Sequence, residues 1–80
     1  MTGHLGKPVL IVALTAMEAV EHAMEHGLLS GDWRFVVHPN DFQGKSPATH
    51  QLVFVGEWRK RRGVTAVCKR ARGQGFAVPP

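Results

Sequence analysis

Residues 9–27 read VLIVALTAMEAVEHAMEHG, in which six apolar residues are followed directly by an amphipathic helical pattern. A run without polar alternation is typical of a strand buried on both faces, and such strands belong mostly to parallel sheets covered by helices. The pattern changes at Thr15, whose hydroxyl can accept a hydrogen bond from the Glu18 amide while the Glu18 carboxylate reaches back to the Thr15 amide. We therefore predict a strand over residues 9–14 and a helix that ends at Gly27, which can adopt the left-handed conformation of a helix stop.

Two more apolar segments follow this unit. WRFVV, residues 33–37, and LVFV, residues 52–55, predict a second and a third strand, separated by a loop rich in Pro and Gly over residues 38–50. Apolar residues at helical spacing then predict a short second helix over residues 64–72. The order is β-α-β-loop-β-α, an α/β fold. We expect a minimal three-stranded parallel sheet with spatial order 2-1-3, resembling half of a Rossmann or flavodoxin-like sheet.

The chain is short enough for one domain. We place that domain at residues 8–75, after a flexible leader over 1–7 and before a tail over 76–80 that is either frayed or a short edge strand. A chain of 80 residues with a single cysteine has a thin margin of stability and no internal disulfide, so self-association is the compensation left. Six apolar residues are too few to cross a bilayer, and no signal peptide precedes them, so we expect a cytoplasmic protein.

The loop between the second and third strands has a consequence for the sheet. In the flavodoxin-like order a helix joins these strands on the face opposite the first helix, but here a loop does so. Only the second helix and Phe42 remain to shield that face, so we expect it to be under-covered and to need a partner or a second copy. Its expected interface anchors are Trp33, Phe35, Phe42 and Trp58, because aromatic side chains dominate interface energetics.

Charge is distributed unevenly along the chain. Residues 1–56 carry three Lys or Arg against five Asp or Glu, whereas residues 57–80 carry seven against one. A basic cluster of this kind attracts phosphate backbones through counterion release, and Trp58 beside it can stack on an exposed base. The residues expected to contact nucleic acid are Arg59, Lys60, Arg61, Arg62, Lys69, Arg70 and Arg72.

Motifs for metal or phosphate chemistry are incomplete. His22 to His26 match the H-x-x-E-H zinc pattern, but a third ligand is missing and the chain is too short for a peptidase cleft. Gly44 to Ser46 match the end of a phosphate loop, but Pro39 stands where its first glycine belongs and Pro47 blocks the helix that should follow. We expect no metal and no cofactor.

Thr15 and Glu57 follow the first and third strands. Between the carboxyl ends of those strands lies the switch point at which open α/β sheets usually bind ligands. A small nucleotide-handling enzyme could use these two residues, although one carboxylate without a His or Cys companion does not make an active site.

The segments HGLLSGDWRFVVHP, residues 26–39, and LVFVGEWRKRR, residues 52–62, resemble small uncharacterised proteins encoded by phages of actinobacteria. Those proteins share a helix ending in HGL or RGL, then G-[DE]-W-R-[FY]-V, then V-x-V-G-x-W ahead of an arginine-rich turn. The resemblance implies a minimal Rossmann-like shape, a phage or prophage origin and thus a bacterial host cytoplasm, but no activity. It departs after the first strand, where similar chains often have an arginine and this chain has Thr15, Ala16 and Met17.

The sequence therefore predicts a non-enzymatic accessory protein that acts by contact with another macromolecule. Self-association or binding of a host protein is the first hypothesis. Nucleic-acid binding through the basic cluster is the second, and nucleotide handling at the strand ends is the third.

Overall fold

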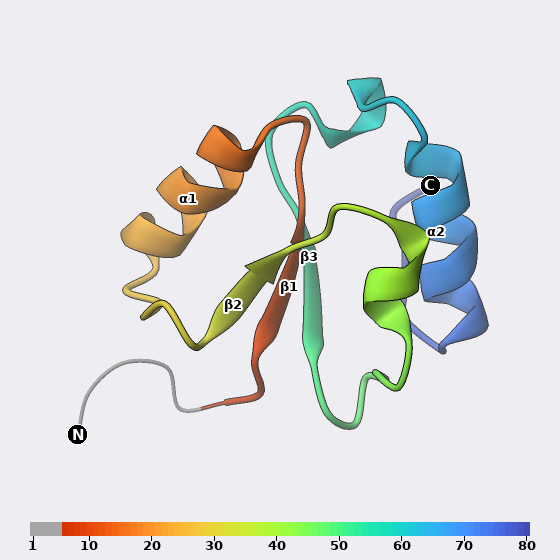
Figure 1. Ribbon diagram of the computed structural model, residues 1–80, viewed down its shortest axis with the longest axis horizontal. Helices are drawn as coiled ribbons and strands as arrows, with labels where there is room; N and C mark the ends of the chain where they lie inside the picture. The colour runs from red at the N-terminus through yellow and green to blue at the C-terminus, as the bar shows by residue number, and fades with distance from the viewer. Residues whose placement is uncertain (1–5) are drawn as a thin grey trace.

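The computed structural model describes residues 6–80, and its sheet has the predicted strand order (Figure 1). The central strand β1 (Val9–Val12) pairs with β2 (Trp33–Phe35) on one side and with β3 (Gln51–Phe54) on the other. Both pairs are parallel. The prediction of an α/β fold with three parallel strands in the order 2-1-3 is confirmed.

Two helices cover opposite faces of this sheet: α1 (Ala16–Glu25) and α2 (Val64–Gly73) (Figure 1). The start of α1 confirms one half of the predicted capping box, since the Thr15 hydroxyl accepts a hydrogen bond from the Glu18 amide at 3.2 Å. The other half differs. The Glu18 carboxylate accepts from the Leu14 amide at 2.9 Å rather than from the Thr15 amide.

The face under α1 is well buried only along the central strand. Ile11, which lies opposite Phe35 and Val53 in the register, is fully buried beneath Ala19 and Ala23. These alanines let the helix approach the sheet closely, but a short helix cannot cover three strands. The apolar side chains that stay partly buried against this cluster are Leu28, Trp33, Phe35, Val53 and Val55.

The opposite face is covered, so the expectation of an under-covered sheet there was wrong. Leu10 and Val12 pack there against Val67 and Ala71 of α2 and against Phe42, which is 0% exposed. The loop that replaces the missing helix folds as a short 3-10 helix, η1 (Pro39–Phe42), and inserts that ring. Along β3 the sheet stays partly exposed on both faces, at Leu52 and Phe54 on the α2 side and at Val53 on the α1 side.

The sequence at η1 carries a helix-start signal within the predicted loop. The His38 ring accepts a hydrogen bond from the Asn40 amide at 3.3 Å, and the Asp41 carboxylate accepts from the His38 amide at 3.1 Å. Pro39 occupies the first helical position, where its missing N–H costs nothing. This reciprocal capping satisfies backbone amides at the start of the turn, and Phe42 at its end is buried in the core.

Residues 76–80 form no strand, yet they are not frayed. Phe76 is 6% exposed, its ring centroid lies 5.6 Å from that of Phe42, and its amide donates to the Ala71 carbonyl at 3.0 Å. The segment predicted as a tail therefore completes the core under α2. Most of the predicted leader, residues 1–5, lies outside the described residues.

Candidate nucleic-acid interface

The predicted basic cluster occupies a 3-10 helix, η2 (Trp58–Lys60), the turn after it, and α2. The side chains of this cluster differ in their partners and in their exposure. Lys60 forms an exposed ion pair with Glu57 at 2.6 Å, so part of its charge is compensated. The Glu57 carboxylate therefore has its partner three positions further along the chain.

Arg61 points into the protein. Its guanidinium donates hydrogen bonds to the carbonyl oxygens of Val36 and Val37 and, at 3.5 Å, to that of Ala13. It also lies 4.9 Å from the centroid of the Phe35 ring. Arg61 thus joins the carboxyl ends of β1 and β2 and is not available to a phosphate. The run of four basic residues contains one structural arginine.

Trp58 and Arg59 form a stacked pair at the start of η2. The Arg59 guanidinium lies 4.4 Å from the centroid of the Trp58 ring, which in turn packs against Phe54 at 4.7 Å. Trp58 is therefore partly buried, and Arg59 covers part of the ring surface predicted to meet a base. A guanidinium plane is itself a surface on which bases stack, so the pair keeps this capacity.

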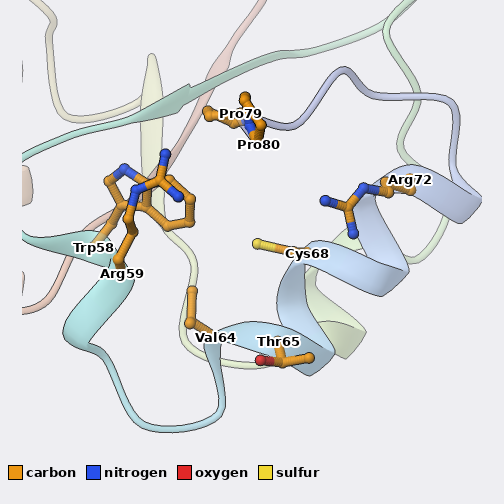
Figure 2. Close-up of a pocket in the computed structure, with 8 residues that line it drawn as sticks. All are labelled: Trp58, Arg59, Val64, Thr65, Cys68, Arg72, Pro79 and Pro80. Carbon is orange, nitrogen blue, oxygen red and sulfur yellow. The ribbon is translucent and has the colours of Figure 1, made fainter.

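One side of α2 faces this pair across a pocket of about 310 Å³. Thr65, Cys68 and Arg72 share that side of the helix because they lie at spacings of three and four. Figure 2 shows the Cys68 sulfur pointing between the Trp58–Arg59 pair on one side and the Arg72 guanidinium on the other. The pocket is lined by Trp58, Arg59, Val64, Thr65, Cys68, Arg72, Pro79 and Pro80.

The electrostatics of this pocket favour an anion. No described residue that lines it is acidic, while two arginines approach it from opposite sides. Burial raises the pKa of the Cys68 thiol, and the charges of Arg72 and Arg59 act in the opposite direction. Both guanidinium groups are therefore close enough to stabilise negative charge near the sulfur. Cys68 is 7% exposed, and no sequence pattern predicted the pocket above it.

The other basic side chains differ in position. Lys69 is exposed on the rim next to Arg72, because those residues lie three apart. Arg70 is partly buried and lies about 200° around the helix from Arg72. Arg62 is exposed in the turn before α2. Within residues 6–80, Lys60 is the only lysine or arginine after position 56 that pairs with a carboxylate.

The switch point between β1 and β3 is filled by the protein itself. The Glu18 carboxylate accepts hydrogen bonds from the Leu14 amide at 2.9 Å and from the Glu57 amide at 3.3 Å. The predicted ligand residues have other partners: the Thr15 hydroxyl caps α1, and the Glu57 carboxylate meets Lys60. A carboxylate thus sits where an anionic ligand would bind. No local sequence signal could reveal it, since Glu18 and Glu57 are 39 positions apart.

The aromatic residues predicted as interface anchors also lie in different environments. Phe42 is fully buried and has no surface to offer a partner, so its assignment as an anchor is corrected. Trp33 and Phe35 are partly buried on β2, an edge strand. The apolar side chains with most exposure were not predicted as anchors: Met17 (64%), Met24 (74%), Leu29 (57%) and Val37 (63%).

The histidines of the H-x-x-E-H pattern stack on each other. The ring centroids of His22 and His26 are 4.1 Å apart, and His26 Nδ1 lies 2.9 Å from the His22 carbonyl oxygen. Within residues 6–80, no three His, Cys, Asp or Glu side chains gather as a metal site would require.

Neither a protein-family model, nor a curated protein, nor a solved structure matches the chain. The resemblance to actinobacterial phage proteins stays a prediction, as do the Rossmann-like label and the cytoplasmic location. In the described part of the chain, no helix is both long and apolar enough to cross a membrane.

Proposed function

We propose that this protein binds single-stranded nucleic acid through the η2–α2 surface, defined as Trp58, Arg59, Arg62, Lys69 and Arg72. The observation that carries the proposal is that the four cations of this surface have no carboxylate partner within residues 6–80. Like charges held on one short segment repel each other in the free protein. A phosphate backbone relieves that repulsion and releases counterions.

The stacked pair on η2 favours a single strand over a duplex. The Arg59 guanidinium lies over the Trp58 ring, 4.4 Å from its centroid, so the two groups together offer a surface for stacking. Bases expose their faces for stacking only when they are unpaired, and stacking on aromatic or guanidinium planes is the usual mode for single strands. Charge alone does not select a strand type, so this pair supplies the preference.

Fluorescence anisotropy with labelled single-stranded and duplex oligonucleotides tests the proposal. With four phosphate contacts we expect the single-strand affinity to fall about fiftyfold between about 50 and 200 mM salt, since the logarithmic slope is about −0.7 per contact. Arg59→Ala should reduce the affinity about tenfold. Arg34→Ala, which removes the same charge from an exposed position of β2, should change the affinity less than threefold. No binding at about 50 mM salt contradicts the proposal.

A second candidate function, self-association, is supported by one specific observation. Met17, Val20 and Met24 fall at spacings of three and four on α1, yet they remain 64%, 39% and 74% exposed. The only residues of α1 that are buried against the sheet are Ala19 and Ala23. An apolar stripe on a small domain is best covered by a second copy, which also meets the need for stability.

Sedimentation velocity over a range of protein concentrations tests this second candidate. The unmodified chain should form dimers at high concentration, and Met24→Glu should make it monomeric without loss of fold, because that side chain is 74% exposed. Glu25→Gln, an exposed position of the same helix that is not spaced by three or four from Met17, Val20 or Met24, is the control and should leave the dimer intact. A chain that stays monomeric at the highest concentration rules the candidate out. Under both candidates the protein acts by contact rather than by catalysis.

A further inference from the structure

We propose that the pocket between η2 and α2 is a subsite for one nucleotide of the bound single strand. The phosphate binds at Arg72, and the base stacks on the guanidinium plane of Arg59 that Trp58 supports. This assignment rests on the proposed function and names the part of the surface that holds the strand in register. The remaining cations of the η2–α2 surface meet neighbouring phosphates.

The shape of the pocket matches this ligand. Its volume of about 310 Å³ is near the lower limit of small-molecule sites, so it accommodates one nucleotide rather than several. Figure 2 shows Pro79 and Pro80 on the wall opposite Thr65, with the Cys68 sulfur and the Arg72 guanidinium directed into the space between. Apolar proline rings suit a sugar or the edge of a base, and Arg72 suits a phosphate.

The positions of the two arginines set the orientation of the nucleotide in the pocket. Arg72 follows Cys68 by one helical turn, so the guanidinium and the sulfur share one side of α2. Arg59 enters from η2, with its guanidinium held against the Trp58 ring. One arginine is thus held as a stacking plane, while Arg72 forms no ion pair with a carboxylate within residues 6–80 and can donate to phosphate oxygens.

Two other hollows in the molecule are less suited to a phosphate, whereas a third, of about 300 Å³, also carries cations, Arg34 and Lys45. A hollow of similar volume, about 320 Å³, lies between α1 and the end of β3, but Glu18, Glu21 and Glu25 line it. Three carboxylates repel an anion. The hollow beside His22 and His26 is lined mostly by apolar residues and by Gln51, and no lysine or arginine among the described residues lines it.

Cys68 provides a direct reporter because it is the only cysteine and lines the pocket. We would measure the rate at which iodoacetamide alkylates the thiol, with and without a saturating short oligothymidylate at about 50 mM salt, where phosphate contacts are strong. Occupancy should slow alkylation about tenfold, and the slowing should disappear at high salt as the strand dissociates. In a Trp33→Phe variant, the strand should also quench the remaining fluorescence, which arises from Trp58.

Matched arginine variants separate the pocket from general charge. Arg72→Ala and Arg70→Ala remove one charge each from the last turn of α2, but only Arg72 lines the pocket. Arg72→Ala should weaken oligothymidylate binding about tenfold and abolish the protection of Cys68. Arg70→Ala should weaken binding less than threefold and keep the protection. Circular dichroism is the check that both variants are folded.

The outcomes distinguish the subsite from the function on which it rests. Protection of Cys68 together with a larger effect of Arg72→Ala supports the subsite. If the strand binds but alkylation is unchanged, or if the two arginine variants weaken binding equally, the subsite is wrong and nucleic-acid binding stands. If the strand does not bind at all, both proposals are overturned.

Discussion

The Glu18 carboxylate accepts a hydrogen bond from the Glu57 amide at 3.3 Å, across 39 positions of sequence. Its second oxygen accepts from the Leu14 amide at 2.9 Å. The first turn of α1 is thereby tied both to the end of its own strand and to the turn that follows β3. Gly56, with φ +58°, gives the carboxylate room, because a Cβ at that position would lie 2.5 Å from Glu18 Oε2. The switch point of the sheet thus serves as a structural joint.

Removing the Glu18 carboxylate should destabilise the protein. Glu18→Ala leaves the part-buried Leu14 amide without this acceptor, and we expect a loss of about 1–2 kcal/mol in the free energy of unfolding. Glu18→Gln, which keeps an acceptor oxygen but no charge, should lose about half as much. Urea denaturation measures both. Glu21→Ala on the exposed side of α1 is the control and should change stability by less than about 0.5 kcal/mol.

Gly56→Ala should act through the same joint. The added methyl group displaces the Glu18 carboxylate from its amides and also places a side chain in the left-handed region, so we expect a loss of about 2–3 kcal/mol. In a Glu18→Ala background the methyl group has nothing to displace, and only the backbone cost of about 1 kcal/mol should remain. The two substitutions should therefore be less than additive in a double-mutant cycle, and full additivity would falsify the displacement.

Local patterns determined most of the fold. The unbroken apolar runs at β1 and β3 and the Thr15 cap were enough to predict parallel strands and the start of α1. Each of these signals is contained within a short stretch of the sequence. That Phe42 shields the sheet was predicted, but its complete burial depends on how the loop before β3 folds. Its signal was present in Pro39 and Asp41, which belong to a helix start within a segment that otherwise reads as a loop.

Arg61 should contribute to stability rather than to nucleic-acid binding. Arg61→Ala leaves the Val36 and Val37 carbonyl oxygens without their donors, and we expect a loss of about 2 kcal/mol in urea denaturation. Arg61→Lys should recover less than half, since one ammonium cannot reproduce the fork of a guanidinium. Arg62→Ala, one position further and exposed, should be nearly neutral for stability.

The same arginine gives the complementary binding test. At a temperature where Arg61→Ala is still folded, its oligonucleotide affinity should stay within about threefold of the unmodified chain, a change expected from net charge alone. A tenfold loss in the folded variant would show that Arg61 reaches a phosphate. From the sequence, Arg59, Lys60, Arg61 and Arg62 are equivalent. The direction in which each side chain points is set by tertiary partners that lie far along the chain. The candidate site was therefore predictable as a segment but not residue by residue.

Phe76 should be essential to the core under α2. Phe76→Ala removes a ring that is 6% exposed and in contact with Phe42, and we expect a loss of about 3–5 kcal/mol. That loss is a large share of the free energy of unfolding expected for a domain of this size, so the midpoint of thermal denaturation should fall strongly. Ala77→Ser, at an exposed neighbouring position, is the control. A frayed segment would tolerate both changes equally.

Acid should weaken the η1 turn through Asp41. Its carboxylate accepts hydrogen bonds from the Val37 amide at 2.7 Å and from the His38 amide at 3.1 Å. Burial alone would raise the pKa of Asp41, but these two amides and the charge of Arg34 outweigh burial and hold the pKa below its ordinary value of 3.8. The folded protein therefore releases this proton more readily than the unfolded chain does.

The sign of the pH dependence follows from that difference. The contribution of Asp41 to stability is fully present above its unfolded pKa of about 3.8 and is lost as the pH falls through the lower pKa of the folded state. His22 and His50, whose pKa values are lowered by burial, produce an earlier loss below about pH 6.5. Urea denaturation at pH 5 and below should show that Asp41→Asn is less stable than the unmodified chain at pH 5, with the difference shrinking as the pH falls below 3.8. A difference that stays constant down to the lowest pH would mean that the lost carboxylate charge is not what stabilises the turn.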